Sequence, residues 1–213
     1  MKFRPSRRQL YACLPDRVVQ VHGARAAGAR YLSFDDGPHP EHTPRLLDLL
    51  ARHAAKASFF LVGRNVERHP EIVARIVREG HLLGNHSFTH ERFGQLPLAA
   101  QLDEFARTDA ALAGFDGRPR HRLRPPQGSL PLPLLLALAR RGRSIAYWSY
   151  DSLDYQSPAP EALIDRLRRA PPAAGDIVLM HDDSALAADA LTVLLPEWRA
   201  AGHSFQALPE ERA

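Results

Sequence analysis

Short apolar stretches alternate with helix-forming stretches along most of this 213-residue chain, and this alternation limits its possible folds more than any other feature. Strands are predicted at Tyr31–Phe34, Ala57–Val62, His81–Gly84, Arg122–Arg124, Ser144–Trp148, Asp176–Met180 and Ser204–Ala207. Helices are predicted to begin at Pro44 and Pro70 and to span Pro97–Leu112, Leu130–Arg140, Pro160–Arg169 and Ala185–Arg199. About seven strand–helix units of this kind are typical of parallel strands joined by crossover helices. We therefore predict an α/β fold with a single distorted (β/α) barrel, and an open doubly wound sheet also fits the pattern.

The first two predicted helices carry local signals at their ends. Thr43 is a suitable N-cap residue, and Pro44 suits the first helical position that follows it. In the second helix, Pro70 stands at the start and Gly80 follows the last apolar position. These signals predict that Thr43 caps the first helix and that Gly80 ends the second.

The composition is that of one globular domain. Hydrophobic residues make up 45% of the chain and charged residues 24%, which is close to the globular average. Barrels of roughly 200–250 residues commonly form single domains. With no internal repeat and no linker-like segment in the sequence, we expect residues 1–213 to form one domain.

The sequence carries no sign of export or of membrane insertion. Its first 14 residues contain three arginines but lack the roughly 7–15 consecutive apolar residues of a secretory signal. No stretch reaches the roughly 18 apolar residues of a membrane span. Cys13 is the only cysteine, so an intramolecular disulfide is excluded. We expect a cytoplasmic protein with no integral membrane segment.

The net charge of +4 is modest, and the arginines that dominate it are scattered along the predicted helices. Nucleic-acid binding predicts clustered basic residues with aromatic residues between them. We therefore expect no nucleic-acid partner.

Polar side chains with chemical capability follow five of the predicted strands. In parallel barrels and sheets, the chemistry takes place at the carboxyl ends of the strands. The residues found there are Asp35 with Asp36, His86, Arg124, Asp151 with Asp154, and His181. This distribution predicts one active site built from five strand ends.

His86 and His90 stand four residues apart, a spacing that places both rings on one face of a helical turn. The alternative is two unrelated surface histidines, since the chain has 11 histidines in all. Asp36 offers a third ligand. Two histidines and one carboxylate leave coordination positions open, as catalytic metal sites do.

Asp35 and Asp36 are adjacent carboxylates directly after an apolar strand. Such neighbours repel each other unless a positive charge lies beside them. A solvated Asp-Gly turn is the simpler interpretation of the pair. The buried strand that leads into it favours a functional one, in which one carboxylate binds a metal and the other acts as a base.

These segments resemble the polysaccharide deacetylase family, also called the NodB-homology domain of carbohydrate esterases. Five family motifs occur in the family's order, over about residues 30–205. They match Phe34–Gly37, His86–His90, Arg124–Gly128, Asp151–Tyr155 and Leu179–His181.

The resemblance implies a role for each matched residue. Asp36, His86 and His90 would bind a divalent metal, usually zinc or another divalent transition ion. Asp35 would be the general base that activates water, and Arg124 would keep it ionised and oriented. His181 would be the general acid for the departing amine, with Asp154 holding its imidazole. The resemblance further places four residues against the substrate: Gln127, Gly128, Tyr155 and Leu179.

Two of these positions depart from the family pattern. Gln127 replaces a common tyrosine at a position whose assigned role is a backbone N–H in the oxyanion hole, which any residue but proline can supply. Tyr155 replaces the usual tryptophan of the acyl pocket and adds a hydroxyl group that needs a partner. Both changes bear on the choice of substrate more than on the reaction.

Together these observations predict a metal-dependent carbohydrate N-deacetylase. It would remove an N-acetyl group from an N-acetylhexosamine unit of an oligosaccharide, a polysaccharide or a lipid-linked sugar. The alternatives are a deformylase or amidase acting on another C–N bond, and a non-catalytic homologue that binds metal or glycan.

Overall fold

The computed structural model describes residues 7–25 and 28–211. Its centre is a curled sheet in which the strands follow the order β1-β6-β5-β4-β3-β2-β8-β7, and β9 pairs with β2. The pairings between neighbouring strands are parallel. The strands are β1 (Val19–Gln20), β2 (Ala29–Asp35), β3 (Ala57–Leu61), β4 (Leu82–Asn85), β5 (Arg122–Leu123), β6 (Ile145–Ala146), β7 (Tyr150–Asp151), β8 (Ile177–His181) and β9 (Ser204–Phe205).

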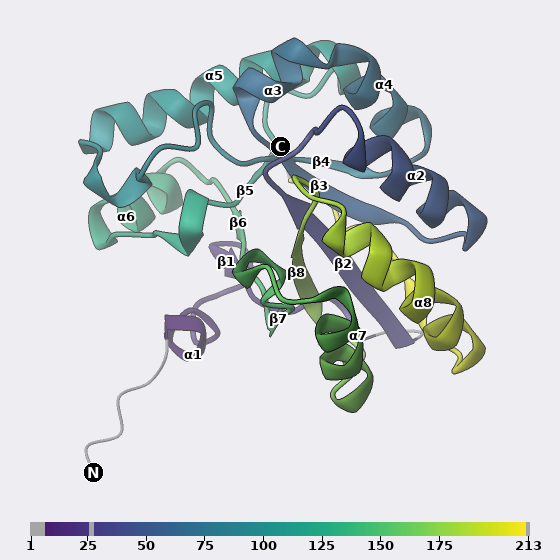
Figure 1. The fold of residues 1–213 in the computed structure, drawn as a ribbon. Coiled ribbons are helices and arrows are strands. Elements are labelled where there is room, and N and C mark those ends of the chain that lie inside the picture. Colours follow the sequence, from purple (N-terminus) through teal and green to yellow (C-terminus); the bar gives the residue numbers. More distant parts are fainter. Residues whose placement is uncertain (1–6, 26–27, 212–213) are drawn as a thin grey trace.

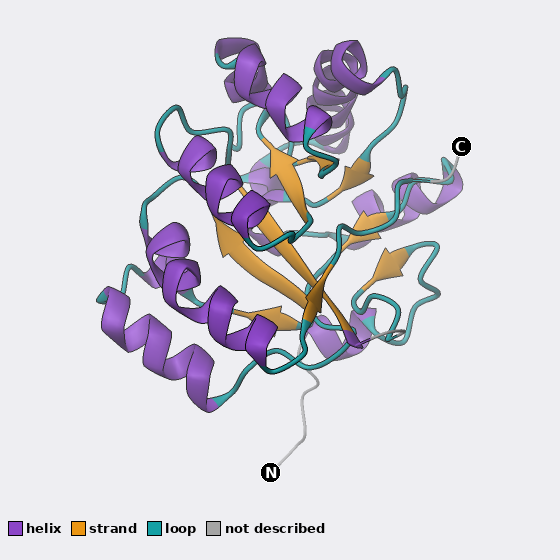
Figure 2. Ribbon diagram, turned by 90° about the vertical axis from the view of Figure 1, so that its right-hand side faces the viewer, coloured by secondary structure: helices purple, strands orange, loops and turns teal. Residues whose placement is uncertain are grey.

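The helices surround this curled sheet on its outside (Figures 1 and 2). They are α1 (Arg7–Tyr11), α2 (His42–Arg52), α3 (Gly63–Arg68), α4 (Pro70–Arg78), α5 (Leu98–Asp116), α6 (Leu132–Arg140), α7 (Pro160–Arg169) and α8 (Leu186–Ala200). Strands inside and helices outside make a distorted (β/α) barrel, so the predicted fold class is confirmed. That the whole chain forms one domain stays a prediction.

The centre of the sheet is also the centre of the hydrophobic core. Strand β3 is buried along its whole length, and β2 is buried at all positions but one. Parallel strands covered by helices are buried on both faces, which explains their nearly continuous apolar sequences. In the register of the sheet, Asp35 at the end of β2 stands beside Phe60 of β3 and His181 of β8. The core therefore leads directly to the polar residues at the strand ends.

Of the two local predictions about helix ends, one is wrong and the other is confirmed. Thr43 does not cap α2, because the helix begins at His42 and its N-cap residue is Glu41. The Thr43 hydroxyl instead accepts a hydrogen bond from the backbone N–H of His39 and donates one to Asp182. The prediction for the second helix is confirmed, since α4 starts at Pro70 and stops two residues before Gly80.

Among the α-helices and strands, four were not predicted: α1, β1, α3 and β7. They are short, with two to six residues each, so none carries enough residues to show a period. Within the described part of the chain, none of the helices has the length and apolar character that crossing a membrane would require. Residues 1–6, which belong to the segment expected to lack a secretory signal, lie outside the described residues.

Candidate active site

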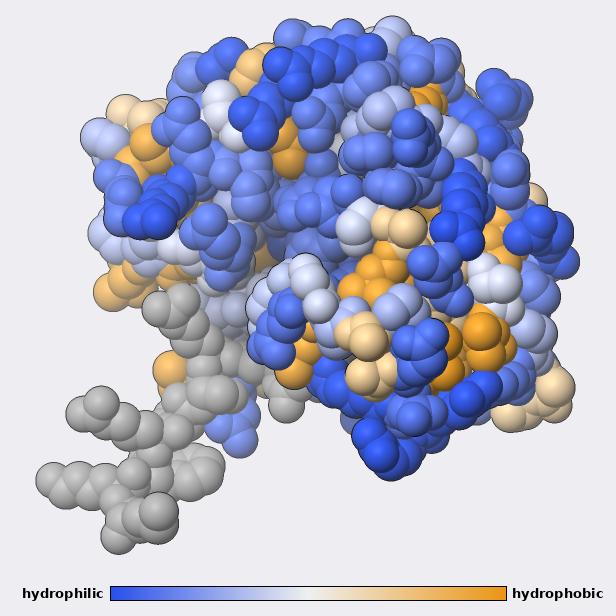
Figure 3. Space-filling view, in the orientation of Figure 1, coloured by the Kyte–Doolittle hydropathy of each residue, from blue (hydrophilic) through white to orange (hydrophobic). Residues whose placement is uncertain are grey.

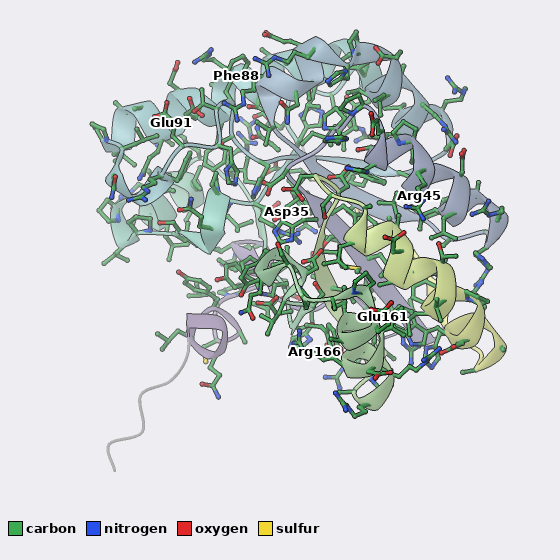
Figure 4. All side chains as sticks on the ribbon, viewed as in Figure 1. Asp35, Arg45, Phe88, Glu91, Glu161 and Arg166 are labelled. Carbon is green, nitrogen blue, oxygen red and sulfur yellow. The ribbon has the colours of Figure 1, made fainter. Side chains whose placement is uncertain are left out.

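The carboxyl ends of β2, β4 and β8 open into a cavity of about 420 Å³. Figure 4 shows Asp35 at the centre of the molecule, where the strands end, whereas Arg45 of α2 and Glu161 of α7 lie on the surrounding helices. Hydrophilic residues gather around the centre of the same face (Figure 3). The cavity is lined by Asp35, Asp36, His86, His90, Gln127, Gly128, Trp148, Asp151, Asp154, Tyr155, Ser157, Leu179, His181, Asp183 and Ser184.

Asp36, His86 and His90 converge at one side of this cavity. The Oδ1 atom of Asp36 lies 3.3 Å from Nε2 of His86 and 3.1 Å from Nε2 of His90. For ligand atoms placed about 2.0–2.1 Å from a tetrahedral ion, a mutual separation of about 3.3 Å is expected. The three side chains are thus spaced as the ligands of one metal ion.

Hydrogen bonding supports the same interpretation. Nδ1 of His86 lies 2.7 Å from the carbonyl oxygen of Arg124, which can only accept, so Nδ1 carries a proton and neutral His86 turns the lone pair of Nε2 toward Asp36. The buried Oδ1 of Asp36 has no hydrogen-bond partner among the described residues. A nitrogen lone pair and a carboxylate oxygen that face each other need a cation between them. The donor set therefore fits a divalent metal.

Protons compete with a metal for this position. Burial would lower the pKa of His86, but the negative charges of Asp35 and Asp36 outweigh it and raise that pKa. For Asp36, burial opposes ionisation, but His86 and the other nearby histidines lower the pKa below its usual range. Metal binding should therefore weaken as the pH falls and the histidines become protonated.

The segment that carries the two histidines is irregular, so the predicted helical turn is wrong. Strand β4 ends at Asn85, and both Ser87 and His90 have positive φ angles, of 69° and 57°. Glu104 of α5 holds this segment, because its Oε2 accepts hydrogen bonds from the backbone N–H groups of Phe88 and Thr89 and from the Thr89 hydroxyl. The rings converge because this turn is anchored by a buried carboxylate.

Asp35, the predicted base, is bound by the buried side chain of Arg124. Nη1 of Arg124 donates to Oδ1 of Asp35 at 2.7 Å, and only 3% of Asp35 is exposed. Arg124 itself is fully buried, donates to the Ser33 hydroxyl and to the carbonyl of Ala146, and stacks on the ring of Phe60 at 3.9 Å. A charge-assisted bond of this kind orients the carboxylate and balances its charge. Because Arg124 binds Oδ1, the other carboxylate oxygen of Asp35, Oδ2, can accept a proton.

His181, the predicted acid, lies on the other side of the cavity. Nδ1 of His181 lies 2.8 Å from Oδ1 of Asp154, whose Oδ2 accepts the backbone N–H of His181 at 2.7 Å. Burial alone would lower the pKa of His181, but the hydrogen bond and charge of Asp154 outweigh it and raise this pKa to about 9. The imidazole is therefore protonated near neutral pH, the form that a general acid requires.

The predicted substrate-contacting residues also line the cavity. Gln127 has a φ angle of 56°, and Gly128 packs so closely that a Cβ would lie 2.7 Å from Trp148 and from the Tyr147 hydroxyl. Tyr155 is 54% exposed, and its ring meets the edge of His181 with centroids 5.7 Å apart. All eleven predicted site residues meet in this region, ten of them on the cavity wall and Arg124 beneath it.

Several residues of the site were missed in the sequence. Trp148 lines the cavity, although its position reads as the end of an apolar strand. Asn65 donates from Nδ2 to the Asp36 carbonyl at 3.0 Å, and Glu104 anchors the histidine turn. Both belong to helices, where a polar side chain gives no sign of facing inward. Asp183, which also lines the cavity, was missed too, although the pair Asp182-Asp183 directly follows His181 and could have indicated it.

Comparison with known families agrees with this geometry. The family model described as polysaccharide deacetylase matches residues 22–146. The chain belongs to the polysaccharide deacetylase family. The resemblance noted in the sequence is thereby confirmed.

Two relatives within the polysaccharide deacetylase family are 32% identical to this chain. A peptidoglycan-N-acetylglucosamine deacetylase of Bacillus cereus aligns over 84% of this chain and 66% of its own length. A chitooligosaccharide deacetylase of Bradyrhizobium aligns over 89% of this chain and 92% of its own length. This chain thus spans about two thirds of the first relative and nearly all of the second.

Solved structures show the same fold. A peptidoglycan N-acetylglucosamine deacetylase in complex with 4-naphthalen-1-yl-N-oxidanyl-benzamide superposes with a TM-score of 0.83 at 30% identity, covering 90% of this chain and 91% of that one. A pseudoenzyme from Bacillus anthracis superposes with a TM-score of 0.80 at 25% identity, covering 91% of this chain and 68% of that one. Because a pseudoenzyme shares the fold, function has to be argued from the site itself.

Proposed function

We propose that this polysaccharide deacetylase is a metal-dependent hydrolase that removes the N-acetyl group from an N-acetylhexosamine unit of an oligosaccharide, a polysaccharide or a lipid-linked sugar. One observation carries the proposal: a carboxylate bound to Arg124 and an imidazole bound to Asp154 line one cavity together with the Asp36–His86–His90 triad. Hydrolysis of an amide needs a base, an acid and an electrophile, and this cavity offers a group for each.

Asp36, His86 and His90 would hold the metal, for which zinc suits two imidazoles and one carboxylate. When bound, a divalent metal of this kind polarises a carbonyl group and lowers the pKa of water to about 7. Every other task would belong to side-chain and backbone groups of the protein.

Asp35 would take the proton from the attacking water through Oδ2, because Oδ1 is engaged by Arg124. The backbone N–H of Gln127 would donate to the oxygen on which negative charge develops. His181 would then deliver its proton from Nε2 to the departing amine, since Nδ1 is engaged by Asp154. Leu179 and Tyr155 would enclose the acetyl methyl group.

Two alternative functions remain to be tested against this proposal. A deformylase or amidase is supported by Gln127 and Tyr155, which differ from the family pattern at the substrate wall. A non-catalytic homologue that binds metal or glycan has the same fold as an active one. It is disfavoured because the residues proposed as base, acid and metal ligands all line one cavity, and because Asp35 and His181 have the partners expected of them, Arg124 and Asp154.

Acetate release from a panel of substrates would test the proposal. The panel contains N-acetylglucosamine oligosaccharides, peptidoglycan fragments, a lipid-linked N-acetylhexosamine, and N-formyl and simple amide analogues. Each is incubated with enzyme stripped of metal by a chelator and with enzyme restored by zinc. We expect acetate from at least one N-acetylhexosamine substrate with the restored enzyme only.

Three outcomes would contradict this expectation. Preferential release of formate would support the deformylase, and turnover of simple amides alone would support the amidase. Tight binding of zinc and glycan without any product would support the non-catalytic homologue. Asp35→Asn serves as the inactive control, because it keeps the shape of the site and removes the base.

A further inference from the structure

Asp182 follows His181 at the end of β8 and is 1% exposed. It lies outside the five sequence motifs and does not line the cavity. Its carboxyl group is nevertheless close to the turn that carries the predicted base and metal ligand, since a Cβ placed on Gly37 would lie 2.3 Å from one of its oxygens. Asp182 therefore contacts this turn from behind.

Two hydrogen bonds join Asp182 to the segment around this turn. The backbone N–H of Asp182 donates to the carbonyl oxygen of Asp35 at 3.2 Å and so extends the pairing of β8 with β2 by one bond. Its Oδ2 accepts the hydroxyl of Thr43 at 2.5 Å, and this hydroxyl in turn accepts the backbone N–H of His39 at 2.8 Å. Asp182 thus connects the strand of His181 to both ends of the segment 35–43.

The turn needs such support because Asp36 has a φ angle of 79°, in the left-handed region that L residues adopt only with strain. On one side, Asn65 binds the carbonyl of Asp36 and the backbone N–H of Val62 binds the carbonyl of Gly37. Asp182 provides the contact on the other side. Between them, these residues fix the direction in which the Asp36 carboxylate points.

Folding alone does not account for a carboxyl group at this position. Oδ1 of Asp182 is buried and has no hydrogen-bond partner within residues 7–25 and 28–211. Burying an unpartnered polar atom costs roughly 1–3 kcal/mol. Burial also raises the pKa of Asp182 to about 7, which shows how unfavourable the charged form is there.

We propose that Asp182 is a positioning residue for the deacetylase reaction. It holds the Asp35–Asp36 turn against the end of β8, and so fixes the metal ligand and the base relative to His181. The proposal rests on the proposed function, because it assumes that Asp36 binds the metal and that Asp35 and His181 share one reaction.

Four variants would test this role. Asp182→Ala removes the contacts with Gly37 and Thr43, whereas Asp182→Asn keeps the volume and an oxygen that accepts the Thr43 hydroxyl. Thr43→Val removes that hydroxyl and leaves Asp182 in place. Asp176→Ala is the matched control, since Asp176 precedes the same strand at its opposite end and accepts hydrogen bonds from Ser149 and Ala173.

For each variant, zinc affinity is measured by competition with a chelating dye, kcat and KM by acetate release at saturating zinc, and Tm by circular dichroism. We expect Asp182→Ala to raise the zinc Kd about tenfold or more and to lower kcat, with KM little changed. Asp182→Asn should restore most of both losses, and Thr43→Val should raise the Kd severalfold. Asp176→Ala should lower Tm only.

An Asp182→Ala protein with wild-type zinc affinity and kcat would overturn the proposal. So would an Asp182→Asn protein as impaired as Asp182→Ala, because charge rather than position would then be the cause. If Asp182→Ala does not fold, an unchanged zinc Kd in Thr43→Val would overturn it. If wild-type protein binds zinc but releases no acetate from any substrate, the proposed function fails, and the zinc affinities still test the positioning role.

Discussion

The pairing of His181 with Asp154 predicts a specific change in the pH dependence of the reaction when Asp154 is replaced by asparagine. Burial lowers the pKa of His181, but the hydrogen bond and charge of Asp154, with smaller contributions from the charges of Asp35 and Asp36, raise it to about 9. In Asp154→Asn the negative charge is lost and burial remains. The pKa of His181 should then fall to its ordinary value of 6.5 or below.

The size of the effect follows from these two values. Since one pH unit corresponds to about 1.4 kcal/mol, the rise in pKa from 6.5 to about 9 favours the protonated imidazole by about 3 kcal/mol, and Asp154 is its largest favourable cause. At pH 8, about 90% of His181 is protonated in the wild type and about 3% in the variant. If His181 is the general acid, kcat/KM at pH 8 should fall about thirtyfold, with a smaller loss at pH 6.

Acetate release measured from pH 5.5 to 10 at saturating zinc would show the shift. Activity is lost on the alkaline side as His181 loses its proton, so this limb should move from about pH 9 to pH 6.5 or below. Metal content is measured at each pH as the control. An alkaline limb that stays at the wild-type position would refute the assignment of His181 as the acid, of Asp154 as its partner, or of both.

The same pKa has a consequence for stability that does not depend on activity. A histidine whose pKa rises on folding stabilises the protein below its unfolded pKa of 6.5, and this contribution is lost as the pH rises through about 9. Urea unfolding of the wild type should therefore show up to about 3 kcal/mol less stability at pH 9.5 than at pH 6 from this group. The decline should largely vanish in Asp154→Asn.

Four further substitutions test other parts of the site. Asp35→Asn should abolish acetate release and keep the metal, whereas His86→Ala should lose both; near wild-type turnover of Asp35→Asn would show that the base is another residue. Arg124→Leu should lower the free energy of unfolding in urea by about 3–5 kcal/mol, because it leaves the Asp35 charge buried without a partner; a loss below about 1 kcal/mol would contradict this. Gly128→Ala should lower kcat/KM about ten- to a hundredfold without changing zinc affinity, because its Cβ would push on Trp148 and displace the substrate wall; equal kcat/KM values for variant and wild type would show that this wall tolerates movement.

Much of the fold was predictable from the sequence because its central strands are buried on both faces. Continuous apolar runs such as those in β2 and β8 are recognisable without any knowledge of their partners, and each of these two ends at a chemically capable residue. The helix α7 was predicted at its observed bounds, because Pro160 marks its start. Signals of this kind are local, so a single sequence contains them.

The supporting residues of the site could not be predicted in the same way. Glu104 looks like a surface charge on a helix, and Thr43 looks like a helix cap. What each does depends on a segment that the fold brings beside it: the histidine turn for Glu104 and the end of β8 for Thr43. The i, i+4 spacing of His86 and His90 likewise predicted that the two rings converge, but the backbone between them is irregular rather than helical. Reactive groups are visible in a sequence, whereas their supports become visible only when the chain is folded.

The aromatic wall of the cavity comes from an unusual place. Trp148 belongs to the short connection between β6 and β7 rather than to either strand, and its ring stacks on Tyr147 at 4.0 Å. Tyr147 in turn meets the ring of Tyr11 from α1. Arg124, which donates to Asp35, also donates to the backbone carbonyls of Ala146 and Tyr147, and its guanidinium lies 5.8 Å from the Trp148 ring. One buried guanidinium thus ties the aromatic wall to the proposed base, so a substitution that shifts this wall should also disturb the Asp35 carboxylate.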